Sequence, residues 1–158
     1  MDEQTFKKFR NTCGKFATGV TIVTSTSHKE TLGMTANGFM SVSLDPALIV
    51  VSIGKKQKMH DAIIKNKNFG VSILTSKQEA LSNHFAGQKD PNLIVNFQKV
   101  NGVEVLEENL AHFVAELVSS HEEGDHTLFI GKVTDFDFNE KESDPLLYFG
   151  GYKTLKSN

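Results

Sequence analysis

Segments typical of β-strands follow one another along this chain, with no regular alternation of strands and helices. Val20–Ser25 is rich in β-branched residues, and Ala47–Ile53 is an apolar run typical of a strand covered on both faces. The others are Leu32–Ala36, Phe39–Leu44, Phe69–Leu74, Ala111–Ser120 and Thr127–Phe138, about seven in all, with a short last strand at Leu146–Phe149. Since regular helical crossovers are missing, we expect a mainly β fold with flanking helices, its antiparallel sheet folded into a sandwich or closed into a barrel.

An amphipathic helix is expected at the N-terminus. Phe6, Phe9, Cys13 and Phe16 recur there at steps of three and four residues, which is the spacing of one helix face. Gly14 marks the region of its end. Cys13 lies among the phenylalanines, so we expect it to be a small buried apolar residue rather than a reactive thiol.

Two further helices are expected inside the chain. One passes through Met59, and the other begins at Ser76-Lys77-Gln78-Glu79. These four residues match a capping box, in which the Ser76 hydroxyl accepts from the amide of Glu79 and the Glu79 carboxylate reaches back. Residues 87–101 are polar and are expected to form a loop. Glu122–Asp125 predicts a turn that joins the last two long strands into a hairpin.

Composition favours one globular domain, residues 1–158, with 39% apolar and 23% charged residues. The net charge of −2 provides no basic field for nucleic acid or an anionic membrane. The longest strongly apolar run, Ala47–Val51, is far too short to span a membrane. The first ten residues, MDEQTFKKFR, contain no apolar signal core, so we expect a cytoplasmic protein.

Motifs of the common metal and cofactor sites are absent from the sequence. Cys13 is the only cysteine, which excludes an intramolecular disulfide and a cysteine-based zinc site. His121 and His126 are five positions apart, whereas two zinc ligands on one helix face need a spacing of four. No G-x-G-x-x-G motif supports a Rossmann site. We therefore predict no metal.

Three polar stretches allow a functional interpretation beside a structural one. Gly33–Ser43 offers hydroxyls, an amide and small residues that suit a polar heterocycle, but Asn37-Gly38 also fits a simple hairpin corner. Ser52–Lys58 combines a strand end, a glycine and three lysines, which fits either an anion site or a solvated basic turn. Gly124–Thr127 presents an acid, a histidine and a hydroxyl, at a pocket mouth or in a surface turn.

Taken in order, these stretches resemble the short-chain flavin reductase family, the reductase components of two-component phenol and 4-hydroxyphenylacetate monooxygenases. The matching segments are Phe16–Thr24, Gly33–Pro46, His60–Ile63, Phe69–Leu74, Phe85–Gly87, Gly124–Gly131, Pro145–Phe149 and Gly151-Tyr152. The resemblance implies a flavin-binding split β-barrel, usually a homodimer with flavin near the subunit interface. It also implies hydride transfer from NADH or NADPH to FAD or FMN, with reduced flavin diffusing to a partner oxygenase.

The resemblance also assigns site residues. Those that would contact flavin are Thr35, Ala36, Asn37, Ser41, Val42, Ser43, Ser52, Ile53, Gly54, Lys58, Phe85, Ala86 and Gly87. Among these, Ser52–Gly54 would lie near the ribityl chain and phosphate, with Lys58 as a phosphate partner. Gly124, Asp125, His126 and Tyr152 would contact the nicotinamide nucleotide. His126 would position the cofactor, and hydride transfer itself requires no protein acid or base.

This sequence departs from the family pattern in two places. Gly38 stands where relatives more often have Ser or Ala, and no arginine follows Gly150-Gly151. These departures leave the choice between NADH and NADPH open, and the sequence does not distinguish FAD from FMN. Two other functions remain alternatives: a non-catalytic flavin-binding protein, and a reductase with permanently bound flavin that serves another electron acceptor.

Overall fold

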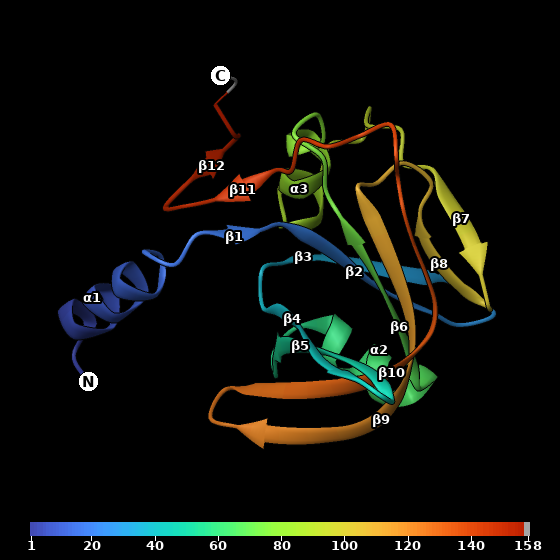
Figure 1. The fold of residues 1–158 in the computed structure, drawn as a ribbon. Helices are drawn as coiled ribbons and strands as arrows, with labels where there is room; N and C mark the ends of the chain where they lie inside the picture. Colours follow the sequence, from blue (N-terminus) through green and yellow to red (C-terminus); the bar gives the residue numbers. More distant parts are fainter. Residues whose placement is uncertain (157–158) are drawn as a thin grey trace.

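The computed structural model describes residues 1–156, and its main feature is a seven-stranded sheet (Figure 1). The strands are β2 (Thr21–Thr26), β3 (Thr31–Ala36), β4 (Phe39–Leu44), β5 (Ala47–Gly54), β6 (Asn68–Ile73), β9 (Ala111–Glu123) and β10 (His126–Phe138). They lie in the order β3-β2-β6-β9-β10-β5-β4, and every neighbouring pair is antiparallel. The predicted antiparallel sheet and the β9–β10 hairpin are confirmed.

The two edge strands of this sheet, β3 and β4, are consecutive in the chain. Only Asn37 and Gly38 separate them, a link that spans roughly 10 Å at most. The sheet therefore curls until its edges come close, which gives a barrel that is split between β3 and β4 (Figure 1). Asn37-Gly38 crosses this seam and is not a hairpin corner. Of the two folds left open by the strand pattern, the split barrel is confirmed.

The barrel interior is filled by alternate side chains of its strands. In β5, Ile49, Val51 and Ile53 are buried in the main core. Helix α2 (Lys58–Asn66) adds Met59 and Ile63 to the same core, as its apolar spacing predicts. This alternation turns the remaining side chains of β5 toward the outer face of the barrel, where the candidate site lies.

A second hairpin was not expected from the sequence. β7 (Phe97–Val100) and β8 (Val103–Leu106) pair across Asn101-Gly102, so the expected loop over residues 87–101 is wrong at its end. Both turn residues have positive φ, 48° and 81°, which is the backbone of a tight two-residue hairpin. Val103, Val105 and Leu106 are buried in the cores of the barrel, and Glu104, between the two valines, is half-buried.

The start of α3 (Glu79–Phe85) differs from the predicted capping box. Gln78, not Ser76, occupies the N-cap position, and no side chain caps the helix. The Gln78 Oε1 instead accepts a hydrogen bond from the backbone N–H of Thr75 at 2.9 Å. Because this longer side chain already fixes the turn, the helix begins later than the Ser76–Glu79 pattern predicts.

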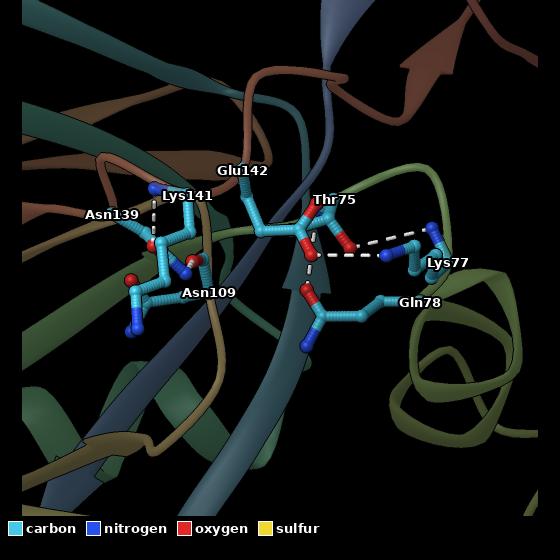
Figure 2. A network of polar contacts seen from close by, with 7 residues as sticks. All are labelled: Thr75, Lys77, Gln78, Asn109, Asn139, Lys141 and Glu142. Atoms are coloured by element: carbon cyan, nitrogen blue, oxygen red, sulfur yellow. Dashed lines mark hydrogen bonds and ion pairs between the residues drawn. The ribbon is translucent and has the colours of Figure 1, made fainter.

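A polar network ties this turn to the segment that leads into the last strands (Figure 2). The Lys77 Nζ lies 3.0 Å from Glu142 Oε1, and the Asn139 side chain donates to the carbonyl of Asn109 at 3.4 Å. These contacts hold residues 139–145 beside the N-terminal end of α3 and so help to place the chain end that follows.

Helix α1 (Glu3–Cys13) projects from the barrel, and none of its residues is buried (Figure 1). The predicted helix is confirmed, but the burial of Cys13 is wrong: its side chain is exposed. The apolar face predicted for α1 exists, but its phenylalanines Phe6, Phe9 and Phe16 are exposed. After α1, β1 (Thr18–Gly19) pairs with β11 (Leu147–Tyr148), which pairs with β12 (Tyr152–Lys153). None of the helices within residues 1–156 is long and apolar enough to cross a membrane.

Candidate functional site

Two of the predicted binding segments meet where β5 ends and β10 begins. Gly54 and His126 face each other in the antiparallel register, and the backbone N–H of Lys55 donates to the carbonyl of Asp125 at 2.9 Å. A Cβ at Gly54 would lie 3.8 Å from the His126 Nε2. The segment Ser52–Gly54 and the turn Gly124–His126 are therefore neighbours in space, although about 70 residues separate them in sequence.

The turn fixes the orientation of His126. Gly124 has a φ of 63°, which suits a tight hairpin turn. The Nδ1 of His126 lies 2.8 Å from Asp125 Oδ1, and both side chains are exposed. The hydrogen bond from His126, followed by the charges of His126 and Lys56, holds the pKa of Asp125 below its ordinary value. Because Nδ1 is engaged, the Nε2 of His126 is the ring nitrogen left for a ligand.

A cavity of about 610 Å³ lies on the outer face of the barrel, beside the seam. Its volume is within the range of small-molecule sites, and apolar side chains make up most of its wall. Three of the residues assigned to flavin line it: Asn37, Val42 and Ser52. The backbone N–H of Ser52 donates to the carbonyl of Gly38 at 2.8 Å, which fastens the seam link to β5. The structure thus brings parts of two predicted segments into one cavity.

A second group of assigned residues gathers around α3. The Thr35 hydroxyl donates to the carbonyl of Ser82 at 2.6 Å, and the Ser82 hydroxyl lies 2.6 Å from the Tyr152 hydroxyl. The Phe85 ring packs so closely on β3 that a Cβ at Gly33 would lie 2.6 Å from it. Thr35, Phe85 and Tyr152 are therefore joined through one helix, but none of them lines the cavity.

The remaining assigned residues lie in varied surroundings. Ala36 and Ile53 are buried, so that any contact they make with a ligand comes from their backbone. Lys58 lines a separate pocket with Ser27 and Asp61. The others are Ser41 and Ser43 on β4, and Ala86 and Gly87 at the exposed end of α3.

Sequence reasoning missed the segment Phe16–Gly19, which forms a wall of the cavity. The Thr18 Oγ1 in this wall is buried, with no hydrogen-bond partner among residues 1–156. An unpaired buried hydroxyl costs free energy unless a ligand or water satisfies it. The segment lies within a stretch that carries the family resemblance, but its apolar composition gives no chemical signal of a site.

His60 was assigned no role in the site, although it lies in a segment that carries the family resemblance. It is buried, and its Nε2 lies 2.7 Å from the Oγ1 of Thr127, the residue next to His126. Its Nδ1 has no hydrogen-bond partner within residues 1–156. The imidazole thus joins α2 to the first residues of β10. Within residues 1–156, no group of three or more His, Cys, Asp or Glu side chains could hold a metal ion.

Known proteins are similar to this chain over most of its length. The chain is 41% identical over 151 residues to an NADH-dependent flavin reductase from Rhodococcus sp, covering 93% of this chain and 85% of the relative. It is 34% identical over 148 residues to the reductase component of 4-hydroxyphenylacetate 3-monooxygenase from Thermus thermophilus, covering 93% and 95%.

Solved structures show the same fold. The flavin reductase PheA2 superimposes with a TM-score of 0.91 at 46% identity, covering 99% of this chain and 100% of that one. The NADH:FAD oxidoreductase SgcE6 from Streptomyces globisporus gives a TM-score of 0.90 at 32% identity, covering 100% and 92%. The pattern of the flavin reductase-like domain matches residues 13–156, and this chain therefore belongs to the flavin reductase-like domain family.

Proposed function

We propose that this chain is an NADH-dependent flavin reductase, a single domain that transfers a hydride from NADH to FAD or FMN. The observation that carries the proposal is the meeting of the apolar cavity, the strand end Ser52–Gly54 and the His126 turn on one side of the barrel. Relatives named as NADH-dependent FMN and FAD reductases support NADH as the donor. NADPH is the alternative donor.

The residues present fit a flavin. The cavity has an apolar wall for a flat ring system and polar groups at Asn37, Ser52 and Thr18, of which the Thr18 hydroxyl lacks a partner within residues 1–156. Bound flavin supplies the redox chemistry, since its ring accepts the hydride. The backbone near Ser52 and Gly54 would hold the ribityl chain and phosphate.

The protein contributes binding and orientation. Asp125 fixes the imidazole of His126 through Nδ1, so that Nε2 is presented beside Gly54 to the nicotinamide nucleotide. Apolar side chains such as Leu128 and Ile130 exclude water from the cavity wall. A site of this kind increases the reaction rate mainly by holding the two reactants in one reactive geometry.

We also propose that the reduced flavin passes to a separate monooxygenase. Relatives named as reductase components or subunits of monooxygenases support this role. A homodimer is part of the same proposal, because Phe6 and Phe9 on the apolar face of α1 are exposed in the single chain. We propose a cytoplasmic location, which suits an enzyme that consumes NADH and releases reduced flavin by diffusion.

The test follows NADH oxidation by the purified protein with and without added FAD or FMN. We expect a rate that increases with free flavin. A protein that binds flavin but leaves it oxidised under anaerobic NADH and NADPH would instead be the flavin-binding protein. Reduction that does not depend on free flavin would support the enzyme with bound flavin and another electron acceptor.

His126→Ala tests the site itself, with His121→Ala on the same hairpin as the matched control. His126→Ala should raise KM for NADH by about tenfold, because it removes a polar contact to the nucleotide, and should leave the Kd of FMN nearly unchanged. His121 is exposed on β9 and lines no cavity described above, so its replacement should change neither constant. Equal effects of both variants would remove the assigned role of His126.

A further inference from the structure

Three segments that are distant in the sequence meet at Ser82, a buried residue of α3. The Ser82 hydroxyl lies 2.6 Å from the Tyr152 hydroxyl on β12. The backbone carbonyl of Ser82 accepts a hydrogen bond from the Thr35 hydroxyl on β3, also at 2.6 Å. Ser82 therefore joins an edge strand of the barrel to the last strand of the chain.

From Tyr152, a series of contacts leads to a wall of the cavity assigned to flavin. On the β1–β11–β12 sheet, Tyr152 lies opposite Tyr148, and Tyr148 lies opposite Thr18 (Figure 1). The rings of Tyr152 and Tyr148 also pack edge to face, with their centroids 5.7 Å apart. Thr18 belongs to the segment Phe16–Gly19, which lines the cavity. The place of this wall is therefore set by a small sheet that includes Tyr152.

From Thr35, a second series of contacts leads to the seam between β3 and β4. Thr35 is the last residue but one of β3, and Asn37, which follows two positions later, lines the same cavity. Thr21 also lines the cavity, and its hydroxyl donates to the carbonyl of Ala36 at 2.7 Å. Through Thr35 and Tyr152, Ser82 is thus connected to two parts of the cavity lining that are distant in the sequence.

The β1–β11–β12 sheet is small and depends on how Tyr152 is anchored. Its strands are each two residues long, so they supply few backbone hydrogen bonds. Helix α1, which precedes β1, buries none of its own residues. The Tyr152 ring packs against the core cluster that contains Val20 and Leu146. Replacement of Tyr152 by Phe would keep this packing and remove only the hydroxyl that contacts Ser82.

We propose that Tyr152 is a positioning residue for the flavin cavity: its hydroxyl contact with Ser82 holds the small sheet and so places the wall Phe16–Gly19. This wall contains the Thr18 Oγ1, the buried atom that has no partner within residues 1–156 and that a flavin would satisfy. The role differs from the contact with the nicotinamide nucleotide that the resemblance assigns to Tyr152. The inference rests on the proposed flavin reductase function and adds that the end of the chain controls flavin affinity.

The test compares Tyr152→Phe and Ser82→Ala with the control Tyr148→Phe. The control also removes one tyrosine hydroxyl from the small sheet, but Tyr148 is 39% exposed. Amide hydrogen exchange is measured without ligand, and the Kd of FMN is measured by quenching of its fluorescence. We expect both test variants to accelerate exchange over residues 16–19 about tenfold and to raise the Kd of FMN about fivefold. Exchange over the β9–β10 hairpin should not change, and the control should match the wild type.

The double variant Tyr152→Phe/Ser82→Ala shows whether the two hydroxyls act as one contact. Its Kd for FMN should equal that of either single variant, and effects that add would overturn the proposal.

Two further results would overturn the proposal. Faster exchange in every strand would mean that the hydroxyl pair only stabilises the whole fold. A higher KM for NADH at saturating FMN, with unchanged exchange over residues 16–19, would mean that Tyr152 contacts the nucleotide instead. Wild-type protein that binds no flavin would remove the proposed function, and the exchange comparison would still decide whether the Ser82–Tyr152 pair holds the wall.

Discussion

At the residue scale, the contact between Asp125 and His126 makes a prediction that needs no ligand. The hydrogen bond from His126 is the main reason that the pKa of Asp125 lies below 3.8. His126→Ala should therefore raise the pKa of Asp125 toward 3.8, and Lys56→Ala should raise it less. Carbon-detected NMR of the carboxyl group measures both. An unchanged pKa in His126→Ala would show that the contact does not form in solution.

The direction of this pKa shift also determines the pH range in which the contact between Asp125 and His126 stabilises the fold. A carboxyl whose folded pKa is lowered stabilises the fold above its unfolded pKa, and loses that effect as the pH falls through the lower folded value. The Asp125 side chain is therefore ionised at neutral pH, where it can orient His126. The side chains are exposed, so the contact contributes to the geometry of the turn more than to the stability of the protein.

His60 gives a second prediction at this scale. His60→Leu removes the hydrogen bond to Thr127 and should raise KM for NADH about fivefold, because the turn next to Thr127 is held less firmly. His60→Gln keeps an amide donor near the position of Nε2 and should restore most of the affinity. His112→Leu is the control, since His112 is also buried but lies opposite Asp137 at the far end of the hairpin, with its Nε2 3.8 Å from Asp135 Oδ1. If all three variants change only the free energy of unfolding and leave KM for NADH unchanged, His60 does not position the turn.

The sequence predicted which residues have side chains suited to a binding site. It did not always predict the direction in which those side chains point. The structure places the predicted site residues Asn37 and Ser52 in one cavity and His126 opposite Gly54. Ile53 turns into the core, because it alternates with Ser52 along β5. Cys13 has the spacing of a buried residue and is exposed. Periodicity shows which side chains share a face, and not what covers that face.

At the element scale, the long β9–β10 hairpin depends on a glycine. A Cβ at Gly131 would lie 2.6 Å from the Phe69 ring and 2.7 Å from the Ala115 Cβ. Gly131→Ala should therefore lower the free energy of unfolding by about 1–3 kcal/mol, measured by urea denaturation. Gly151→Ala is the control, because nothing lies within 4 Å of its Cβ. Equal stability of the two variants would contradict the close packing.

The elements with strong apolar periodicity were predicted well, and those fixed by single side chains were not. The β7–β8 hairpin was missed although Asn101-Gly102 is a typical two-residue turn, because polar residues around it suggested a loop. The start of α3 was misplaced because Gln78 folds back on the amide of Thr75 and competes with the capping box. Such competition depends on three-dimensional contacts that a local pattern does not contain.

At the scale of the whole molecule, closure of the barrel depends on contacts that are distant in sequence. The strand pattern alone allowed a sandwich or a barrel, and the two-residue link between β3 and β4 excludes an open sheet. β2 pairs with β6 and β6 with β9, so the sheet order is not the chain order. The family resemblance, rather than the strand pattern, predicted the split barrel.

The last prediction concerns α1 and the proposed homodimer. An isolated helix of 11 residues is marginally stable in water, and α1 buries none of its residues within one chain. Phe6 is 50% exposed and Phe9 59%, so this apolar face is free to pack on another copy of the chain. Light scattering should give twice the chain mass of 17.5 kDa for the wild type.

Phe6→Asp/Phe9→Asp should reduce that mass to 17.5 kDa, because charges on the apolar face would have to be desolvated on association. Lys7→Ala/Lys8→Ala changes the polar side of the same helix and should remain dimeric. A wild type that has the mass of one chain would leave α1 without the packing that a helix of this length needs. In that case the helix should fray in solution, and amide hydrogen exchange over Glu3–Cys13 would be fast.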